Sequence, residues 1–93
     1  MYLVVRTWTN AGVLADAMQA RTQEVIDLLS GVPGFQSYYA TRDGDTLTTI
    51  TICESREGTQ ESTRRAGEWA KQNMAGTTVG APTIAEGQTF VHF

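Results

Sequence analysis

The chain has 93 residues, so we expect a single domain that spans residues 1–93. Its formal net charge is only −3, and because a nucleic-acid-binding face is normally basic, nucleic acid is not an expected partner. No apolar run approaches the roughly 18 residues of a membrane span, so no membrane partner is expected. No signal-peptide pattern is present, and Cys53 is the single cysteine. Together these features favour the cytoplasm.

The first predicted elements are a strand over Tyr2–Trp8, which is rich in β-branched and aromatic residues, and a helix over Val13–Ser30. Asn10 lies between them, and its side chain is expected to cap the helix. Gly31 and Pro33 follow the helix and are typical of a helix end. The apolar stripe of this helix consists of Leu14, Met18, Val25, Leu28 and Leu29.

A β-hairpin is predicted next. Strands over Phe35–Thr41 and Thr46–Glu54 flank a turn at Arg42–Asp45, whose Asp-Gly pair is a strong hairpin signal. A second helix is expected over Thr59–Ala75, with Gly76 ending it.

The last predicted strand, Thr83–Phe93, is extended, with a bulge at Gly87. The element order is therefore β-α-β-β-α-β, the ferredoxin-like arrangement of an α+β fold, in which two helices cover one face of an antiparallel sheet. Leu, Ile, Val and Phe together number only 19, so the core is thin. We expect a homodimer in which a second copy of the chain covers the open sheet face.

The helix-to-strand junction Gly31–Phe35 and the following Gln36–Tyr39 resemble the corresponding segment of the dimeric α+β barrel superfamily, and more narrowly of its antibiotic biosynthesis monooxygenase-like group. The run Glu68-Trp69-Ala70 is similar too. The resemblance implies a dimer whose two sheets face each other, with a ligand pocket in each subunit between sheet and helices. Members include cofactor-independent oxygenases of quinol-type aromatics, haem-degrading enzymes and proteins without a known activity, so the fold does not give the function.

Haem-degrading members of this group combine an Asn in the first strand, a Trp, and an axial His on the second helix. Asn10 and Trp69 loosely fit the first two positions, but the only histidine, His92, lies in the last predicted strand. The resemblance therefore does not extend to haem breakdown, and no cofactor is expected. With one cysteine and one histidine, no metal site is expected either.

The second predicted helix has an inward face of small residues, with Trp69 at its boundary. Trp69 is interpreted either as a core aromatic or as a pocket wall that stacks on a flat ligand. Asn73, beside it, is a candidate ligand contact. The small face consists of Ser62, Thr63, Ala66, Gly67, Ala70 and Asn73.

Other candidates are spread along the chain. Arg21 falls at the centre of the apolar stripe, where it either lays its stem on apolar surface or faces a pocket and binds an anionic or phenolate ligand. Arg6 in the first predicted strand is similar to Arg21, because it shares a face with Tyr2, Val4 and Trp8. It would be purely structural if an acidic residue across a strand paired with it. Tyr38 and Tyr39 point to opposite faces of the sheet, and Tyr39 is the candidate for stacking on the ligand. His92 is either a hydrogen-bonded residue near the dimer interface or a general base.

Three functions are compatible with this pattern. The first is a cofactor-independent monooxygenase of a small phenol or quinol, whose substrate supplies the electron to O₂ as an enolate or phenolate while the protein excludes water. Its catalytic candidates are Asn10, Trp69 and His92, and its ligand-binding candidates are Arg21, Tyr39 and Asn73. The second is a non-catalytic dimeric binding protein for a small hydrophobic metabolite. The third is a purely structural dimer without a pocket.

Overall fold

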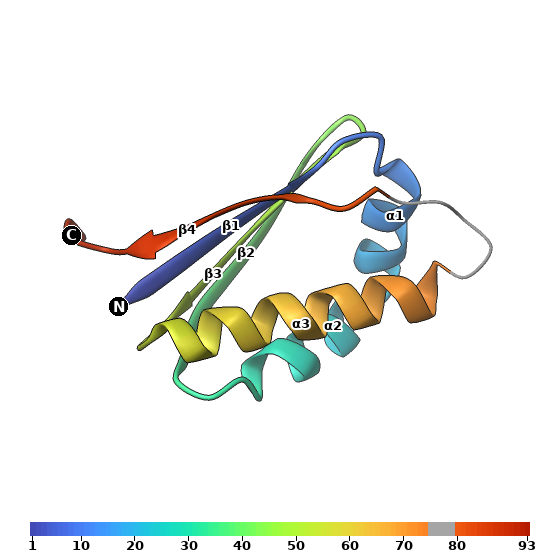
Figure 1. Cartoon of the computed structure of the whole chain (residues 1–93). Helices are drawn as coiled ribbons and strands as arrows, with labels where there is room; N and C mark the ends of the chain where they lie inside the picture. The colour runs from blue at the N-terminus through green and yellow to red at the C-terminus, as the bar shows by residue number, and fades with distance from the viewer. Residues whose placement is uncertain (75–79) are drawn as a thin grey trace.

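The computed structural model describes residues 1–74 and 80–93, and within them a four-stranded antiparallel sheet carries three helices on one face (Figure 1). The strand order is β2-β3-β1-β4, so β1 and β3 are the central strands. This is the ferredoxin-like α+β fold that the sequence predicts, with the first helix divided in two. The elements are β1 (Tyr2–Trp8), α1 (Gly12–Ala20), α2 (Thr22–Ser30), β2 (Phe35–Asp43), β3 (Thr46–Cys53), α3 (Arg56–Asn73) and β4 (Thr83–Gln88).

The single helix predicted over Val13–Ser30 is wrong, because α1 and α2 meet at Arg21. The backbone of Arg21 has φ −126° and ψ 41°, which is not helical. The hydroxyl of the adjacent Thr22 donates to the carbonyl oxygens of Met18 and Gln19, at 3.3 and 3.1 Å, and so competes for the acceptors that a continuous helix needs. The apolar stripe runs through the break, which is why its periodicity predicts one helix.

The predicted hairpin is present, although β2 continues to Asp43 and β3 ends at Cys53. Its turn consists of Gly44 and Asp45. Gly44 has φ 60°, in the left-handed region that glycine enters without a Cβ penalty. A glycine at the first position of a two-residue turn suits the twist of the two strands that it joins.

The last strand is shorter than predicted, because β4 ends at Gln88 and residues 89–93 form no regular element. The bulge expected at Gly87 is also absent, since Gly87 lies opposite Leu3 in an uninterrupted register with β1. The irregularity in the sheet lies instead at the start of β2, between Phe35 and Ser37.

Helix α3 begins at Arg56, earlier than predicted, and ends at Asn73, while the expected terminator Gly76 lies outside the described residues. The predicted small face is correct in part. Ser62 is fully buried, but Gly67 is exposed and a Cβ there would meet nothing within 4 Å, so Gly67 does not face the sheet.

Close packing of α3 occurs at its first turn. A Cβ on Gly58 would lie 2.6 Å from the carbonyl oxygen of Pro33 and 2.8 Å from Cβ of Cys53. Those distances are shorter than real Cβ contacts, so only glycine allows the helix to approach the sheet this closely.

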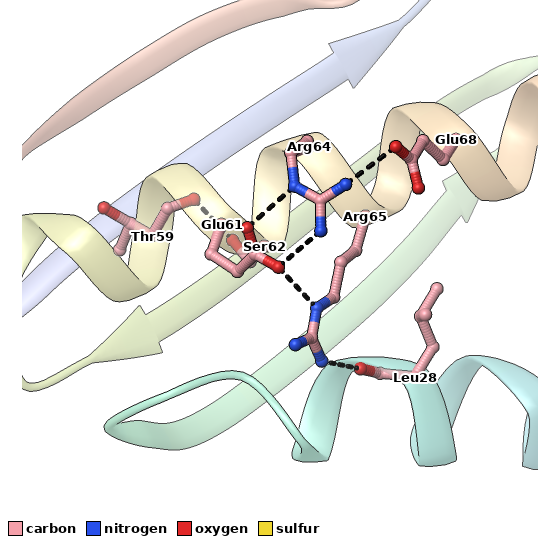
Figure 2. Close-up of polar contacts among 7 residues, drawn as sticks. All are labelled: Leu28, Thr59, Glu61, Ser62, Arg64, Arg65 and Glu68. Atoms are coloured by element: carbon pink, nitrogen blue, oxygen red, sulfur yellow. Dashed lines mark hydrogen bonds and ion pairs between the residues drawn. The ribbon is translucent and has the colours of Figure 1, made fainter.

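Arg65 joins α3 to α2 (Figure 2). Its Nη1 donates to the carbonyl oxygen of Leu28 at 3.0 Å, and its Nε donates to Glu61 at 2.8 Å. Glu61 also accepts from Arg64, which pairs with Glu68 at 2.7 Å. The last carbonyls of a helix have no partner within the helix, so Arg65 satisfies one of them from outside.

The two faces of the sheet differ in what covers them. On the helix side, alternate residues of β1 and β3 are buried: Val4, Arg6, Trp8, Leu47, Thr49, Thr51 and Cys53. On the other face, the open sheet face, no described helix packs (Figure 1). It presents half-buried apolar side chains, namely Leu3, Val5, Ile50 and Ile52. In the part of the chain that the structure describes, no helix has the length and apolarity needed to cross a membrane.

Candidate functional site

A pocket of about 380 Å³ lies between the junction of α1 with α2 and the strands β2 and β3. We call it the open pocket. Tyr38 lines it from β2, and so does Arg42, whose Nη1 donates to Asp16 and Gln19 at 2.6 and 2.8 Å. The charge of Arg42 is thus already paired. The other lining residues are Ala15, Met18, Gln19, Thr22, Val25, Ile26, Ala40, Thr41 and Leu47.

A second space, the internal cavity, lies deeper, beneath Trp69, and has a volume of only about 20 Å³. That volume holds roughly one water molecule, so the space expected under Trp69 is almost closed. Met18, Val25 and Tyr38 line both spaces and form a partition between them. The rest of the cavity is lined by Trp8, Leu14, Leu28, Leu29, Thr49, Ala66, Trp69 and Ala70.

Three of the predicted site residues form one hydrogen-bonded chain. Trp69 is 8% exposed, and its Nε1 donates to Oε1 of Glu24 at 3.3 Å. Asn73 donates to the carbonyl oxygen of Trp69 at 2.9 Å and accepts from Nη1 of Arg21. This chain ties α3 to the α1–α2 junction. Trp69 is a core aromatic with a satisfied polar edge and a wall of the internal cavity, whereas exposed Arg21 lines neither space.

The other three predicted residues lie elsewhere. Asn10 is exposed and has φ 52°. The prediction that its side chain caps the helix is wrong, because the N-cap residue of α1 is Ala11 and this helix end has no side-chain capping hydrogen bond. Tyr39 is 56% exposed on the open sheet face. His92 lies exposed beyond the end of β4, not in a strand. None of the three lines the open pocket or the internal cavity.

Arg6 lies in the interior of the fold, among hydroxyl groups. It is 1% exposed, and it donates four hydrogen bonds that all end on hydroxyl oxygens. Nε bonds Thr49 at 3.1 Å, and Nη2 bonds Thr51 at 2.5 Å. Nη1 bonds Ser62 and Thr63, at 3.2 and 2.8 Å. Among the described residues no carboxylate forms an ion pair with it, so the acidic cross-strand partner is absent.

The electrostatics of this region follow from burial. Burial lowers the pKa of Arg6, against the opposing influence of Tyr38, Cys53 and Glu86. Burial raises the pKa of Tyr38, while the charge of Arg6 and a hydrogen bond with Thr49 act to lower it. Burial likewise raises the pKa of the Cys53 thiol, which is the behaviour of an inert thiol.

Two residues important to this region, Tyr38 and Arg6, are not among the six catalytic and ligand-binding candidates predicted from the sequence. Tyr38 was considered only as one of an adjacent pair, and the inward member is decided by the register with β3, where Tyr38 lies opposite buried Thr51. For Arg6, the available signal is its place between Val4 and Trp8, two apolar residues of one strand face.

In the described portion of the chain, no group of three His, Cys, Asp or Glu residues is placed to hold a metal ion. No histidine occurs in α3, where the haem-degrading pattern requires one. This helix therefore offers no imidazole to an iron atom.

No family model matches the chain, and no curated protein matches it. Solved structures are similar in fold. The monooxygenase from the gene ActVA-Orf6 of Streptomyces coelicolor, solved with Nanaomycin D, has a TM-score of 0.71 at 16% identity, over 99% of this chain and 89% of that chain. The heme-degrader MhuD of Mycobacterium tuberculosis, with two hemes in its active site, has a TM-score of 0.68 at 12% identity, over 100% and 99%.

A dimeric ferredoxin-like protein from an uncultured marine organism has a TM-score of 0.65 at 13% identity, over 100% of this chain and 98% of that chain. The chain spans 65% of the length of MupZ from Pseudomonas fluorescens, with 91% of this chain covered at 13% identity and a TM-score of 0.69. The chain has the fold of the antibiotic biosynthesis monooxygenase-like proteins. Identities this low show the monooxygenase-like fold alone, so an activity has to be argued from this chain's own residues.

Proposed function

We propose that the chain binds a small phenol- or quinol-type aromatic in the open pocket and oxidises it as a cofactor-independent monooxygenase. The observation that carries this proposal is the pocket itself, whose volume of about 380 Å³ and largely apolar lining suit a small aromatic molecule. Its position between helices and sheet, with Tyr38 available for stacking or hydrogen bonding, supports an aromatic occupant.

The proposed chemistry needs an ionised substrate and O₂. The substrate loses a proton, and the enolate or phenolate that results gives one electron to O₂. The substrate radical and superoxide then combine to a peroxide at a ring carbon that carries a hydrogen atom. The peroxide takes back the proton and loses water, which consists of its outer OH group and that ring hydrogen. The oxidised ring carbon thus gains a carbonyl oxygen from O₂, and the second oxygen atom leaves as water. The protein's part is to hold the substrate and keep bulk water from the intermediates.

We propose that the working unit is a homodimer that closes the open sheet face. Ile50 and Val5 lie opposite each other at the centre of this face and are only half-buried in one subunit. Phe90 and Phe93 of the C-terminal segment are almost entirely exposed, which is unusual for an isolated subunit. A solved neighbour of the same fold is described as dimeric. The composition also supports our proposal of the cytoplasm as its compartment.

A second candidate function is non-catalytic binding of a small hydrophobic metabolite in the same pocket. It is favoured by the position of Asn10 and His92, the candidates for proton handling, which both lie outside the open pocket. The roles proposed for Trp69, Arg21, Asn73, Asn10 and His92 are tested by alanine substitution of each residue in the assay below.

The test is O₂ consumption by the pure protein with a panel of hydroquinones, together with the melting temperature in the absence of O₂. Ala40→Trp should fill the open pocket and abolish both turnover and the rise in melting temperature. Gln36→Trp, at an exposed position of the same strand outside this pocket, should keep both. Turnover that survives Ala40→Trp would contradict the proposed site, and a raised melting temperature without turnover would favour the binding protein.

A further inference from the structure

The interior of this fold contains a positive charge that forms no ion pair with a described residue. Arg6 is 1% exposed, and four of the five N–H groups of its guanidinium donate to the hydroxyls of Thr49, Thr51, Ser62 and Thr63. Hydroxyls satisfy the hydrogen bonds, but they carry no net charge. Buried charges in proteins are normally paired, because an unpaired one loses its hydration without a compensating attraction.

The charged and titratable groups around Arg6 do not supply this pairing. Glu86 of β4 faces the helix side, and its charge acts to raise the pKa of Arg6, but burial outweighs this influence and the ion pair of Glu86 is with Arg56, at 3.8 Å. Tyr38 and Cys53 are the other titratable groups that influence Arg6, and burial raises the pKa of each, which keeps both neutral. On the cavity side, Glu24 is bound to Nε1 of Trp69.

Arg6 is connected to the internal cavity through the side chain of Thr49. Thr49, which accepts from Nε of Arg6 at 3.1 Å, lines the internal cavity. Tyr38 lines both that cavity and the open pocket, and its own pKa responds to the charge of Arg6 and to Thr49. A ligand hydroxyl that reaches the partition from the open pocket therefore enters the field of Arg6. In an interior of low dielectric constant, this field is much stronger than it would be in water.

We propose that the open pocket takes its ligand as an anion, an ionised phenol or enol, and that Arg6 is the buried positive charge that stabilises this form. The inference rests on the proposed binding site and names the residue that stabilises the ionised form of its ligand. Arg6 acts through Thr49 and the partition and is a positioning residue, since it lines neither space. The arrangement gives a site without an adjacent acid–base pair a means of holding the anion that O₂ must oxidise.

The experiment uses para-nitrophenol, whose ionised form is coloured, and para-nitroanisole, its methyl ether, which cannot ionise. The pKa of bound para-nitrophenol is measured by absorbance against pH with the unmodified protein. We expect it to fall by about one unit, which is equivalent to about tenfold tighter binding of the ionised form. We also expect para-nitroanisole to bind with an affinity independent of pH in the same range.

Three variants assign the effect to Arg6. Arg6→Met should abolish the shift of the probe's pKa, whereas Arg6→Lys, which keeps a positive charge, should retain part of it. Arg64→Met is the matched control, because Arg64 lies exposed on the outer side of α3 (Figure 2), and it should leave the shift unchanged. If Arg6→Met does not fold, the triple variant with Thr49→Val and Thr51→Val replaces the charge and two of its hydroxyls by apolar groups of similar size.

The outcomes separate this inference from the proposed site. A lowered probe pKa that disappears with Arg6 supports both. Binding of both probes at the partition with an unchanged probe pKa, or a shift that survives Arg6→Met, overturns the inference and leaves the pocket in place. Failure of both probes to bind overturns both the pocket and the anion.

Discussion

Tyr38 and Tyr39 show how strongly the surroundings of a side chain depend on its position in a strand. The two residues are adjacent in β2, yet Tyr38 lines the open pocket and Tyr39 is 56% exposed on the open sheet face. Successive strand residues point to opposite faces, so one residue of register decides which tyrosine meets a ligand. We therefore propose that Tyr38, and not Tyr39, contacts the ligand.

The inward position of Tyr38 predicts its titration. Because burial raises its pKa above the ordinary value of 10.0, the folded protein keeps this phenol protonated at a pH where the unfolded chain ionises it. The stability that depends on Tyr38 is thus complete below pH 10.0 and is lost as pH rises through the folded-state pKa. Absorbance titration of the protein and of Tyr38→Phe should differ only above the ordinary range, and a difference that develops at or below it would contradict the buried position.

The environment of Arg6 could not be derived from the sequence. The hydroxyls that receive its hydrogen bonds lie between 43 and 57 positions away along the chain, on β3 and α3. Nothing local distinguishes an arginine among hydroxyls from an arginine opposite a carboxylate. The alternation of Val4, Arg6 and Trp8 does indicate an inward arginine, but only the assembled sheet shows that its partners are neutral.

At the scale of elements, the contact of α3 with the sheet depends on Gly58, and Gly67 in the same helix offers a matched control. Gly58→Ala should lower the free energy of unfolding by about 1–3 kcal/mol, because the new Cβ would overlap Pro33 and Cys53. Gly67→Ala should raise it by about 0.5–1 kcal/mol, because alanine favours the helix and meets nothing there. Chemical denaturation measures both. Equal effects of the two substitutions would refute the close approach.

The network in Figure 2 predicts a loss of stability in acid. Hydrogen bonds from Arg64 and Arg65 lower the pKa of Glu61 from 4.5 to about 2. The resulting stability is complete above pH 4.5 and is lost as pH falls towards about 2. Melting curves should show that Glu61→Gln removes this dependence, while Glu68→Gln, which leaves Glu61 and Arg65 in place, retains it. The same acid dependence in all three proteins would show that Glu61 is not its source.

The elements themselves were predictable where a local pattern decides them. The β-branched run of β1 and the Asp-Gly turn of the hairpin are local signals, and both predicted elements are present. The break at Arg21 was not predictable, because the apolar spacing continues through it while a side-chain hydroxyl ends the helix. The C-terminal residues have strand-like composition, but β4 ends at Gln88, so composition alone does not define where the strand stops.

For the whole molecule, the open sheet face predicts self-association. Ile50 pairs with Val5 on one side and Tyr39 on the other, which makes one row across three strands of this face. Light scattering at micromolar concentration should give the mass of a dimer. Ile50→Lys should shift the protein towards monomer, since it would bury an unpaired charge in the interface, while Gln60→Lys on exposed α3 should not. A monomer mass for the unmodified protein would contradict the dimer.

The open pocket is the proposed ligand site, and methyl NMR with a hydroquinone under anaerobic conditions tests this proposal most directly. Met18 and Val25 belong to the partition, whereas Leu3 and Ile52 lie on the open sheet face. We expect the ligand to shift the methyl signals of Met18 and Val25 and to leave those of Leu3 and Ile52 unchanged. Shifts confined to Leu3 and Ile52, with Met18 and Val25 unaffected, would place the ligand on the other face and contradict the proposal.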